Sequence, residues 1–219
     1  MILRLYSYWR STSSWRVRIG LGLKGLSYEY RPVNLLTGEQ FQEAHRARSP
    51  LGQVPVLEVE EEGRLVRLVQ SIAILEWLDE RWPERPLLPA DPLARARVRA
   101  LAEHVNSGIQ PHHNAAVLKL LKAIAPERYR EWAPTWIALG LDGLERSVRD
   151  TAGRFAYGDS PGLADCYVIP TLYAARRFSV NLAAYPTLRR IEEACATLAP
   201  FQAAAPERQP DAPAEGSTP

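Results

Sequence analysis

Four consecutive hydroxyl side chains, Ser11, Thr12, Ser13 and Ser14, separate a short apolar run from a segment with a helical pattern. Serine and threonine are favoured at helix N-caps, because the side-chain oxygen accepts a hydrogen bond from a backbone N–H of the first turn. The same hydroxyls, beside the positive end of a helix dipole, would stabilise an anionic group placed there. Taken alone, the cluster favours simple helix capping over a binding or catalytic site.

A second candidate position is Ser71, which together with Gln70 follows a predicted strand and opens a predicted helix. The first N–H groups of a helix have no partner within the helix, and with a serine hydroxyl they form an anion site. A cap without any ligand fits the same geometry. The dipeptide Val54-Pro55 lies at the start of another predicted strand, and from these residues alone an ordinary trans proline is expected.

The elements that must hold these residues differ between the two halves of the chain. Up to about residue 85, short β-like runs alternate with helix-like ones. The strand candidates are residues 2–6, 28–33, 54–59 and 65–69. A helical pattern begins at Ile72 and ends before Pro83.

One segment of this first half, residues 15–23, fits two periods. Apolar residues alternate along it as in a strand, while Trp15, Ile19 and Leu23 recur every fourth position as in a helix. Periodicity therefore leaves its structure open.

The second half begins after a proline-punctuated connector at residues 82–89 and is helical throughout. The predicted helical stretches are residues 94–125, 127–149, 163–178 and 187–198. Residues 205–219 are rich in proline and are expected to wrap over the surface or stay loose. The predicted fold class is α/β plus all-α, with a small α/β domain followed by a larger helical one.

The composition excludes several classes of protein. The chain has 219 residues, of which 27 are basic and 25 acidic, so there is no electrostatic reason to expect nucleic acid or an anionic membrane as partner. No apolar run approaches the roughly 20 residues that span a bilayer, and the first residues do not resemble a signal peptide. Two cysteines cannot form a disulfide framework, and the histidines lack a metal-ligand pattern. We expect a cytoplasmic protein without a metal site.

The run YSYWRSTSSWRVRI, residues 6–19, resembles the N-terminal signature of zeta-class glutathione transferases, whose best-known activity is maleylacetoacetate isomerase. The resemblance continues, in family order and spacing, through residues 53–57, 69–71, 108–111, 163–165 and 208–211. It implies a thioredoxin-like domain that binds glutathione, residues 1–84, and an all-helical domain that binds the substrate, residues 90–219. It also implies that residues 15–23 belong to the first helix.

By this resemblance, the hydroxyl of Ser11 faces the sulfur of glutathione, and Thr12 and Ser13 lie beside it as further catalytic residues. A free thiol has a pKa of about 8.5, so little of it is ionised at neutral pH. A hydroxyl donor and a helix N-terminus together lower that value by on the order of 1.5–3 units. This is enough to make the thiolate dominant near neutral pH.

The resemblance also implies which residues bind glutathione. They are Ser11, Ser14, Gln40, Val54, Pro55, Gln70, Ser71, Gln110 and Asn114. The Val54–Pro55 bond is then cis, and the N–H and C=O of Val54 face outward as a strand edge with which an extended peptide can pair. Gln70 and Ser71 hold the γ-glutamyl carboxylate, and Gln40 is a weaker candidate for the glycine end.

The carboxylates of a keto-acid substrate need cations, and the planar fork of arginine suits that role. The positions that match the family are Arg10 and Arg177, with Arg176 as a substitute for Arg177. The chain departs from the family at Ser13, which is commonly cysteine, and at Ala116, which is commonly serine.

The predicted function is a glutathione-dependent cis–trans isomerase of a maleyl keto-acid in aromatic amino acid catabolism. Maleylacetoacetate is the first expectation and maleylpyruvate a close alternative. A transferase acting on small α-halo acids, which would consume glutathione, is another. A non-enzymatic interaction protein on the same scaffold is the alternative from a different class. Family members are usually homodimers, and we expect the same of this chain.

Overall fold

The computed structural model describes residues 1–214 and divides into two compact units. The first is Met1–Leu87 together with the C-terminal segment that begins at Leu198, and the second is Leu88–Thr197. The division after Leu87 lies inside the proline-punctuated connector. The segment from Leu198 groups with the first unit, whereas the sequence-based division placed it with the helical domain.

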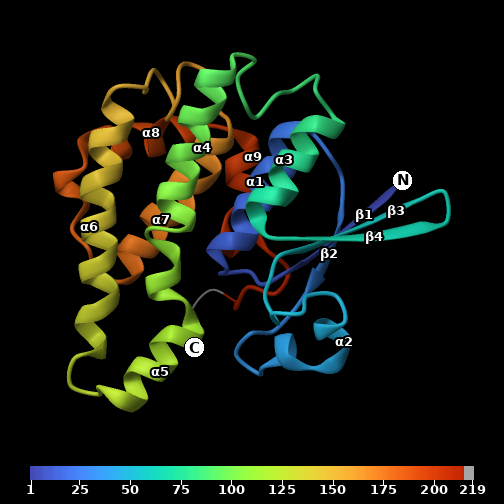
Figure 1. Cartoon of the computed structure of the whole chain (residues 1–219), viewed down its shortest axis with the longest axis horizontal. Helices are drawn as coiled ribbons and strands as arrows, with labels where there is room; N and C mark the ends of the chain where they lie inside the picture. Colours follow the sequence, from blue (N-terminus) through green and yellow to red (C-terminus); the bar gives the residue numbers. More distant parts are fainter. Residues whose placement is uncertain (215–219) are drawn as a thin grey trace. The chain divides into compact units, whose positions relative to one another are not determined.

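The first unit is built on a four-stranded sheet with the strand order β2-β1-β3-β4 (Figure 1). The strands are β1 (Ile2–Ser7), β2 (Glu29–Pro32), β3 (Val56–Glu61) and β4 (Arg64–Val69). β1 and β2 are parallel, and β3 is antiparallel to both β1 and β4. Each strand overlaps one of the four predicted candidates, and the thioredoxin-like domain is confirmed.

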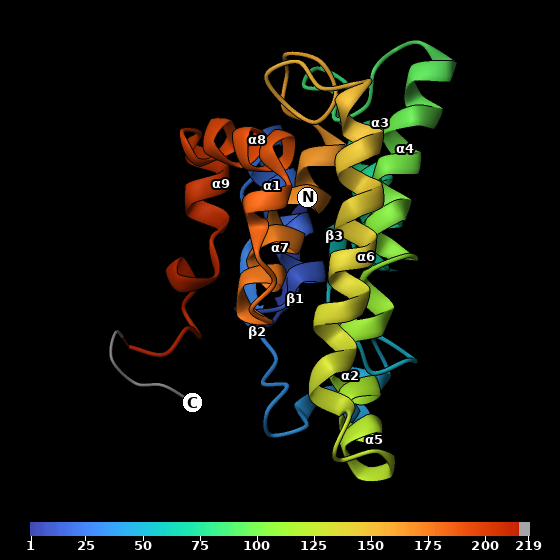
Figure 2. The same cartoon turned by 90° about the vertical axis from the view of Figure 1, so that its left-hand side faces the viewer.

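Two helices, α1 and α3, pack against each other in this unit. Its helices are α1 (Thr12–Lys24), η1 (Glu39–Phe41), α2 (Glu43–Arg46), α3 (Ser71–Arg81), α9 (Ala199–Ala204) and η4 (Pro206–Arg208). Ser11 caps the start of α1, and Gly25 ends it with a φ of 69°, which glycine adopts without steric cost. The segment left open by periodicity is therefore helical. Figure 2 shows α9 beside α1, with the following chain continuing toward β2.

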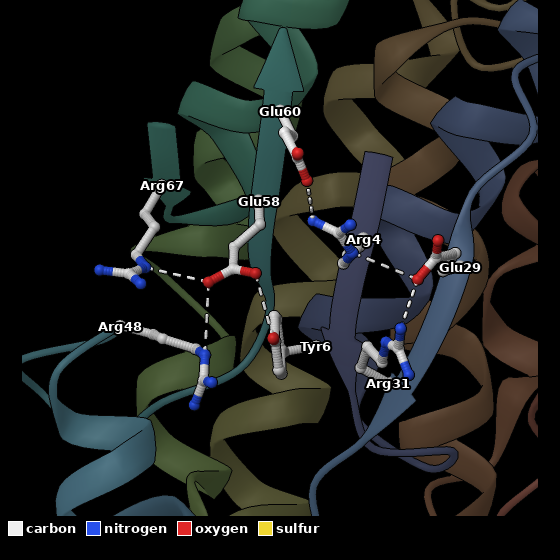
Figure 3. A network of polar contacts seen from close by, with 8 residues as sticks. All are labelled: Arg4, Tyr6, Glu29, Arg31, Arg48, Glu58, Glu60 and Arg67. Atoms are coloured by element: carbon white, nitrogen blue, oxygen red, sulfur yellow. Dashed lines mark hydrogen bonds and ion pairs between the residues drawn. The ribbon is translucent and has the colours of Figure 1, made fainter. Parts of the chain in front are cut away.

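The sheet has one apolar face and one charged face. Leu5 and Leu57, which are paired in register, are fully buried on the apolar face. The charged face carries a network of side chains (Figure 3). Its members are Arg4, Tyr6, Glu29, Arg31, Arg48, Glu58, Glu60 and Arg67.

The buried member of that network is Glu58. Its carboxylate accepts from Tyr6 Oη and Arg67 Nε, both at 3.0 Å, and pairs with Arg48 at 3.3 Å. Burial alone would raise the pKa of Glu58, but the bonds from Arg67 and Tyr6 and the charge of Arg48 lower it below its usual value.

All of the longer elements of the second unit are helices. They are α4 (Pro92–Asn106), η2 (Gln110–His113), α5 (Ala115–Ile124), α6 (Tyr129–Arg149), α7 (Leu163–Arg177), η3 (Leu182–Ala184) and α8 (Pro186–Ala196). The predicted stretch 94–125 is two helices, with Gly108 and Pro111 lying between them. Every residue from 163 to 172 is buried, because α4, α6 and α8 all pack against α7.

Asp165 connects three parts of the second unit near the start of α7. Its Oδ1 accepts the N–H of Ala156 and its Oδ2 accepts the N–H of Gly162, both at 2.9 Å. The thiol of Cys195, on α8, lies 3.9 Å from Oδ1. Burial raises the pKa of Asp165 to about 6, although the two backbone hydrogen bonds act in the opposite direction. Across the described residues, no helix is both long and apolar enough to cross a membrane.

Candidate active site

Three chain segments converge at one end of the sheet in the first unit. Tyr6 of β1 and Val69 of β4 both pair with Val56, the first residue of β3. The turn after β1, the Val54–Pro55 peptide before β3 and the start of α3 after β4 therefore lie at the same end. Strand pairing brings together predicted site residues that are up to about sixty positions apart in sequence.

Ser11 forms the N-cap of α1. Its backbone is extended, with φ −67° and ψ 115°, and its Oγ accepts a hydrogen bond from the N–H of Ser14 at 3.2 Å. Its own N–H donates to the C=O of Tyr8 at 2.9 Å, which closes the turn after β1. Ser11 is half-buried. A hydroxyl that accepts a capping hydrogen bond still has a proton to donate, so capping and contact with an anion are compatible at this residue.

The other hydroxyls of the cluster differ in exposure. Ser13 is half-buried, whereas Thr12 is only 7% exposed and Ser14 is fully buried. The Oγ of Ser14 has no hydrogen-bond partner in the described part of the chain. Ser14 therefore contributes to this helix end through its backbone N–H, and its hydroxyl does not reach the surface that a ligand would meet.

The peptide bond between Val54 and Pro55 is cis, as the family resemblance predicts. Within residues 1–214, the N–H and C=O of Val54 have no hydrogen-bond partner. Two side chains that sequence reasoning missed hold the preceding residue, Gln53. The Nε2 of His45 hydrogen-bonds with the Gln53 carbonyl at 3.0 Å, and the Oγ of Ser49 accepts the Gln53 N–H at 3.1 Å.

The start of α3 combines backbone donors with a buried cation. Gln70 is exposed and precedes the helix with a φ of 68°, and its C=O accepts the N–H of Ile74 at 3.0 Å. Ser71 is 4% exposed, and its Oγ accepts from Nη1 of Arg16 at 3.2 Å. Because Arg16 is almost fully buried, its charge adds to the positive field of this helix N-terminus.

Gln40 lies in η1, and its side chain is directed toward its own loop. Its Nε2 is 3.5 Å from the C=O of Leu35, and its Oε1 is buried without a partner among the residues described. The structure does not bring this amide into contact with the three converging segments.

Two further predicted residues, Gln110 and Asn114, lie in the second unit. Gln110 begins η2 and is half-buried. Asn114 caps α5, because its Oδ1 accepts the N–H of Ala116 at 2.9 Å. The oxygen of Asn114 is therefore engaged within its own helix end, which leaves the amide N–H groups for other contacts.

The three predicted substrate arginines have different surroundings. The guanidinium of Arg10 lies 5.1 Å from the centre of the Trp9 ring and pairs with no carboxylate of the described chain. Arg176 forms a two-pronged ion pair with Glu192 of α8. Arg177 lies 5.1 Å from the centre of the Phe178 ring. The charge of Arg176 is thus balanced by Glu192.

Comparison with known proteins extends these observations to the whole chain. Residues 1–80 match the N-terminal domain of glutathione S-transferases. A maleylacetoacetate isomerase of Pseudomonas aeruginosa is 48% identical over 97% of this chain and 100% of its own length. The solved structure of a maleyl pyruvate isomerase, a bacterial zeta-class glutathione S-transferase, is 42% identical over 96% of this chain and all of that one, with a TM-score of 0.89. The chain belongs to the zeta class of glutathione transferases.

A third relative of this zeta-class enzyme carries a bound molecule. It is the maleylacetoacetate isomerase of Anaeromyxobacter dehalogenans 2CP-1, which is 67% identical over 97% of this chain and 98% of that one, with a TM-score of 0.91. Its structure holds dicarboxyethyl glutathione and citrate in the active site.

The sequence of this zeta-class enzyme predicted the segments that form the site, but not all of the side chains that hold these segments in place. His45, Ser49 and Arg16 gave no signal of their own, because a histidine or serine in a polar loop and an arginine in a helix are most often at the surface. The apolar residues on both sides of Arg16 were the one indication that this arginine lies in a buried segment.

Proposed function

We propose that this zeta-class enzyme is a glutathione-dependent cis–trans isomerase of a maleyl keto-acid. The observation that carries the proposal is the convergence of two helix N-termini and the unpaired backbone of Val54 at one end of the sheet. These positions fit the parts of glutathione. The backbone of Val54 suits its extended peptide, Ser71 with Arg16 suits a carboxylate, and Ser11 suits the thiol. The dicarboxyethyl glutathione in the similar bacterial structure supports sulfur chemistry on a four-carbon dicarboxylate.

When bound, glutathione supplies a thiolate that adds reversibly to the substrate double bond and is released unchanged. The chain's own residues prepare this chemistry. Ser11 donates its hydroxyl proton as a hydrogen bond toward the sulfur, and the N-terminus of α1 favours negative charge at the same place. Arg16 and Ser71 hold a carboxylate at the N-terminus of α3, which fixes the peptide relative to Ser11.

The substrate brings carboxylates of its own, and we assign their binding to arginines. Arg10 follows the turn after β1 and directly precedes Ser11 in sequence, so it is placed beside the sulfur position. The family resemblance assigns a second contact to Arg177. Arg176 is a weaker candidate because Glu192 already neutralises it. Guanidinium groups bind carboxylates through two parallel hydrogen bonds, which orients as well as attracts the substrate.

A spectrophotometric assay with maleylacetoacetate and with maleylpyruvate tests the proposal. Each substrate is followed in the ultraviolet with and without glutathione. We expect turnover of at least one substrate that requires glutathione without consuming it. Turnover that is unchanged when glutathione is omitted would contradict the proposal.

A second candidate is transfer of glutathione to small α-halo acids, because the same activated thiolate would displace a halide. The two activities differ in stoichiometry. Net loss of thiol during turnover would favour the transferase, and a constant thiol concentration favours the isomerase.

We further propose that the enzyme is a cytoplasmic homodimer of aromatic amino acid catabolism. The family resemblance supports the dimer and the pathway. The two free, buried cysteines, Cys166 and Cys195, suit a reducing compartment. Light scattering coupled to size-exclusion chromatography gives the mass of the assembly, and a monomer would contradict the dimer.

A further inference from the structure

The turn that carries Ser11 is held by a residue from the far end of the chain. The N–H of Trp9 donates to Oδ2 of Asp211 at 3.0 Å, across 202 residues of sequence. On the other side of Trp9, its C=O accepts from Nη2 of the buried Arg18 at 2.9 Å. Because Trp9 lies two residues before Ser11 and is itself buried, these bonds fix the path of the turn that leads into α1.

Asp211 is in turn fixed by a residue of β2. Its Oδ1 accepts the hydroxyl proton of Tyr30 at 2.6 Å, so each carboxylate oxygen has a partner of its own. Burial, and then this hydrogen bond, raises the pKa of Tyr30. The phenol therefore stays protonated at neutral pH and remains a donor to Asp211.

The residues around Asp211 fold the C-terminal segment and pack it on the first unit. Within the segment, the buried Gln209 donates through its side-chain amide to the C=O of Ala203 at 2.9 Å and of Ala205 at 2.8 Å. Ala212 packs on an apolar cluster beneath the site. The members of that cluster are Tyr8, Trp9, Val33 and Val54. The segment thus supports both the turn before Ser11 and the residue whose backbone is assigned to the peptide of glutathione.

We propose that Asp211 is a positioning residue, which holds the Trp9 peptide so that the hydroxyl of Ser11 meets the sulfur of glutathione. This inference rests on the proposed function and adds to it a residue that does not touch the ligand. Without the carboxylate, the buried N–H of Trp9 loses its acceptor, and the turn must shift to satisfy it. A displacement of about 1 Å at a reacting group lowers rate by as much as about 100-fold.

Four variants separate positioning from simple structural support. Asp211→Ala removes both hydrogen bonds. Asp211→Asn keeps them, because its amide oxygen accepts from Trp9 and its amide N–H donates to the oxygen of Tyr30. Tyr30→Phe removes only the second bond. Glu207→Ala is the matched control, since Glu207 is an exposed carboxylate of the same segment without a hydrogen bond among the described residues.

Each variant is measured for kcat, for the KM of glutathione, for melting temperature and for the pKa of the bound thiol. The last is read from the ultraviolet absorbance of the thiolate against pH. In Asp211→Ala we expect the thiol pKa to rise by about 1 unit and kcat to fall by about 10- to 100-fold. Asp211→Asn should recover most of the activity, Tyr30→Phe should show a smaller loss, and Glu207→Ala should match the parent enzyme.

A folded Asp211→Ala enzyme with an unchanged thiol pKa and kcat would overturn the inference, even if its melting temperature fell. If Asp211→Ala does not fold, Asp211→Glu is measured in its place. This variant keeps the charge but moves the carboxylate oxygens by one methylene, so the Trp9 peptide must shift to reach them. A normal thiol pKa in Asp211→Glu would then overturn it. Failure of the proposed function would give a different result from failure of this inference. The parent enzyme would then not bind glutathione, or Ser11→Ala would leave the pKa of the bound thiol unchanged.

Discussion

The chemistry assigned to Ser11 requires one hydroxyl to serve two partners at once. Its oxygen accepts the N–H of Ser14, while its proton remains available to the sulfur. Ser11→Ala removes both contacts. A hydrogen bond to a charged group is worth about 1.5–3 kcal/mol, so we expect kcat/KM to fall by about 10- to 100-fold and the bound thiol pKa to rise by about 1–2 units. Steady-state kinetics and thiolate absorbance measure the two effects.

Ser13→Ala tests the neighbouring hydroxyl, because Ser13 is also half-buried at the same helix end. We expect a smaller fall in kcat/KM than in Ser11→Ala, because the resemblance places Ser13 beside the hydroxyl that faces the sulfur. A near-normal Ser11→Ala enzyme combined with a defective Ser13→Ala enzyme would transfer the sulfur-facing role to Ser13. The cap itself contributes about 1 kcal/mol to stability, and a melting curve of each variant accounts for that part.

Individual residues also show where prediction from sequence ends. Local sequence patterns placed Ser11 and Ser71 at the starts of helices, whereas the cis bond before Pro55 was implied only by the family resemblance. The role of Arg18 could not be predicted, because its guanidinium is satisfied by the backbone carbonyls of Tyr8, Trp9 and Ala204 and by the hydroxyl of Ser7. Only the fold brings Tyr8, Trp9, Ala204 and Ser7 to Arg18, so the sequence around Arg18 does not predict these hydrogen bonds.

Among the elements, the charged face of the sheet provides a prediction about acid stability. The folded state lowers the pKa of Glu58, so its ion pairs stabilise the protein above the unfolded pKa of about 4.3, and this stability is lost as pH falls through the folded value. Glu58→Gln should lower the free energy of unfolding at neutral pH by about 1–2 kcal/mol, since Arg48 and Arg67 are partly exposed and screened. Urea unfolding at neutral and acid pH measures the loss.

Glu61→Gln is the control on the same strand. Its partner Arg81 and Glu61 itself are each 46% exposed, so we expect a change within about 0.5 kcal/mol. Equal losses in Glu58→Gln and Glu61→Gln would show that burial of Glu58 does not strengthen its ion pairs. A parent enzyme whose stability advantage over Glu58→Gln persists in strong acid would contradict the pH dependence.

The structure of α1 explains why its sequence period fitted both a strand and a helix. An amphipathic helix has a polar stripe that reveals the period of 3.6 residues. In α1 that stripe is also buried, with Arg16 bonded to Ser71 and Arg18 to backbone carbonyls. The arginines therefore interrupt the apolar sequence at every second position without facing solvent, and the alternation resembles a strand.

At the scale of the whole molecule, the sequence located the connector but not the destination of the C-terminal segment. The proline-rich residues 82–89 mark the division after Leu87. The segment from Leu198 belongs to the first unit because of specific contacts, such as the bond from Arg18 to the Ala204 carbonyl. Composition predicts that the proline-rich residues 205–219 wrap over the surface or stay loose, but it cannot predict which unit the described part, residues 205–214, joins.

The two units contain buried carboxylates with opposite pH dependence, Glu58 in the first and Asp165 in the second. Burial raises the folded pKa of Asp165 to about 6, above its unfolded value of about 3.9. The stability that Asp165 contributes to the folded state is therefore fully present below the unfolded pKa, and it is lost as pH rises through 6. The loss amounts to about 3 kcal/mol at neutral pH. We therefore expect acid to remove the stabilisation that comes from Glu58, and neutral pH to remove the stabilisation that comes from Asp165.

Asp165→Asn tests this expectation by removing the ionisation. The amide cannot accept both the Ala156 and the Gly162 N–H, so the variant should lose about 1–3 kcal/mol at pH 4, where the parent carboxyl is largely protonated. Its stability should then decline less than that of the parent between pH 4 and 7, because no charge is forced into the interior. Unfolding free energies across this range measure the slope, with the exposed Asp150→Asn as control. Parallel slopes for the parent and Asp165→Asn would show that Asp165 does not set the pH dependence of the second unit.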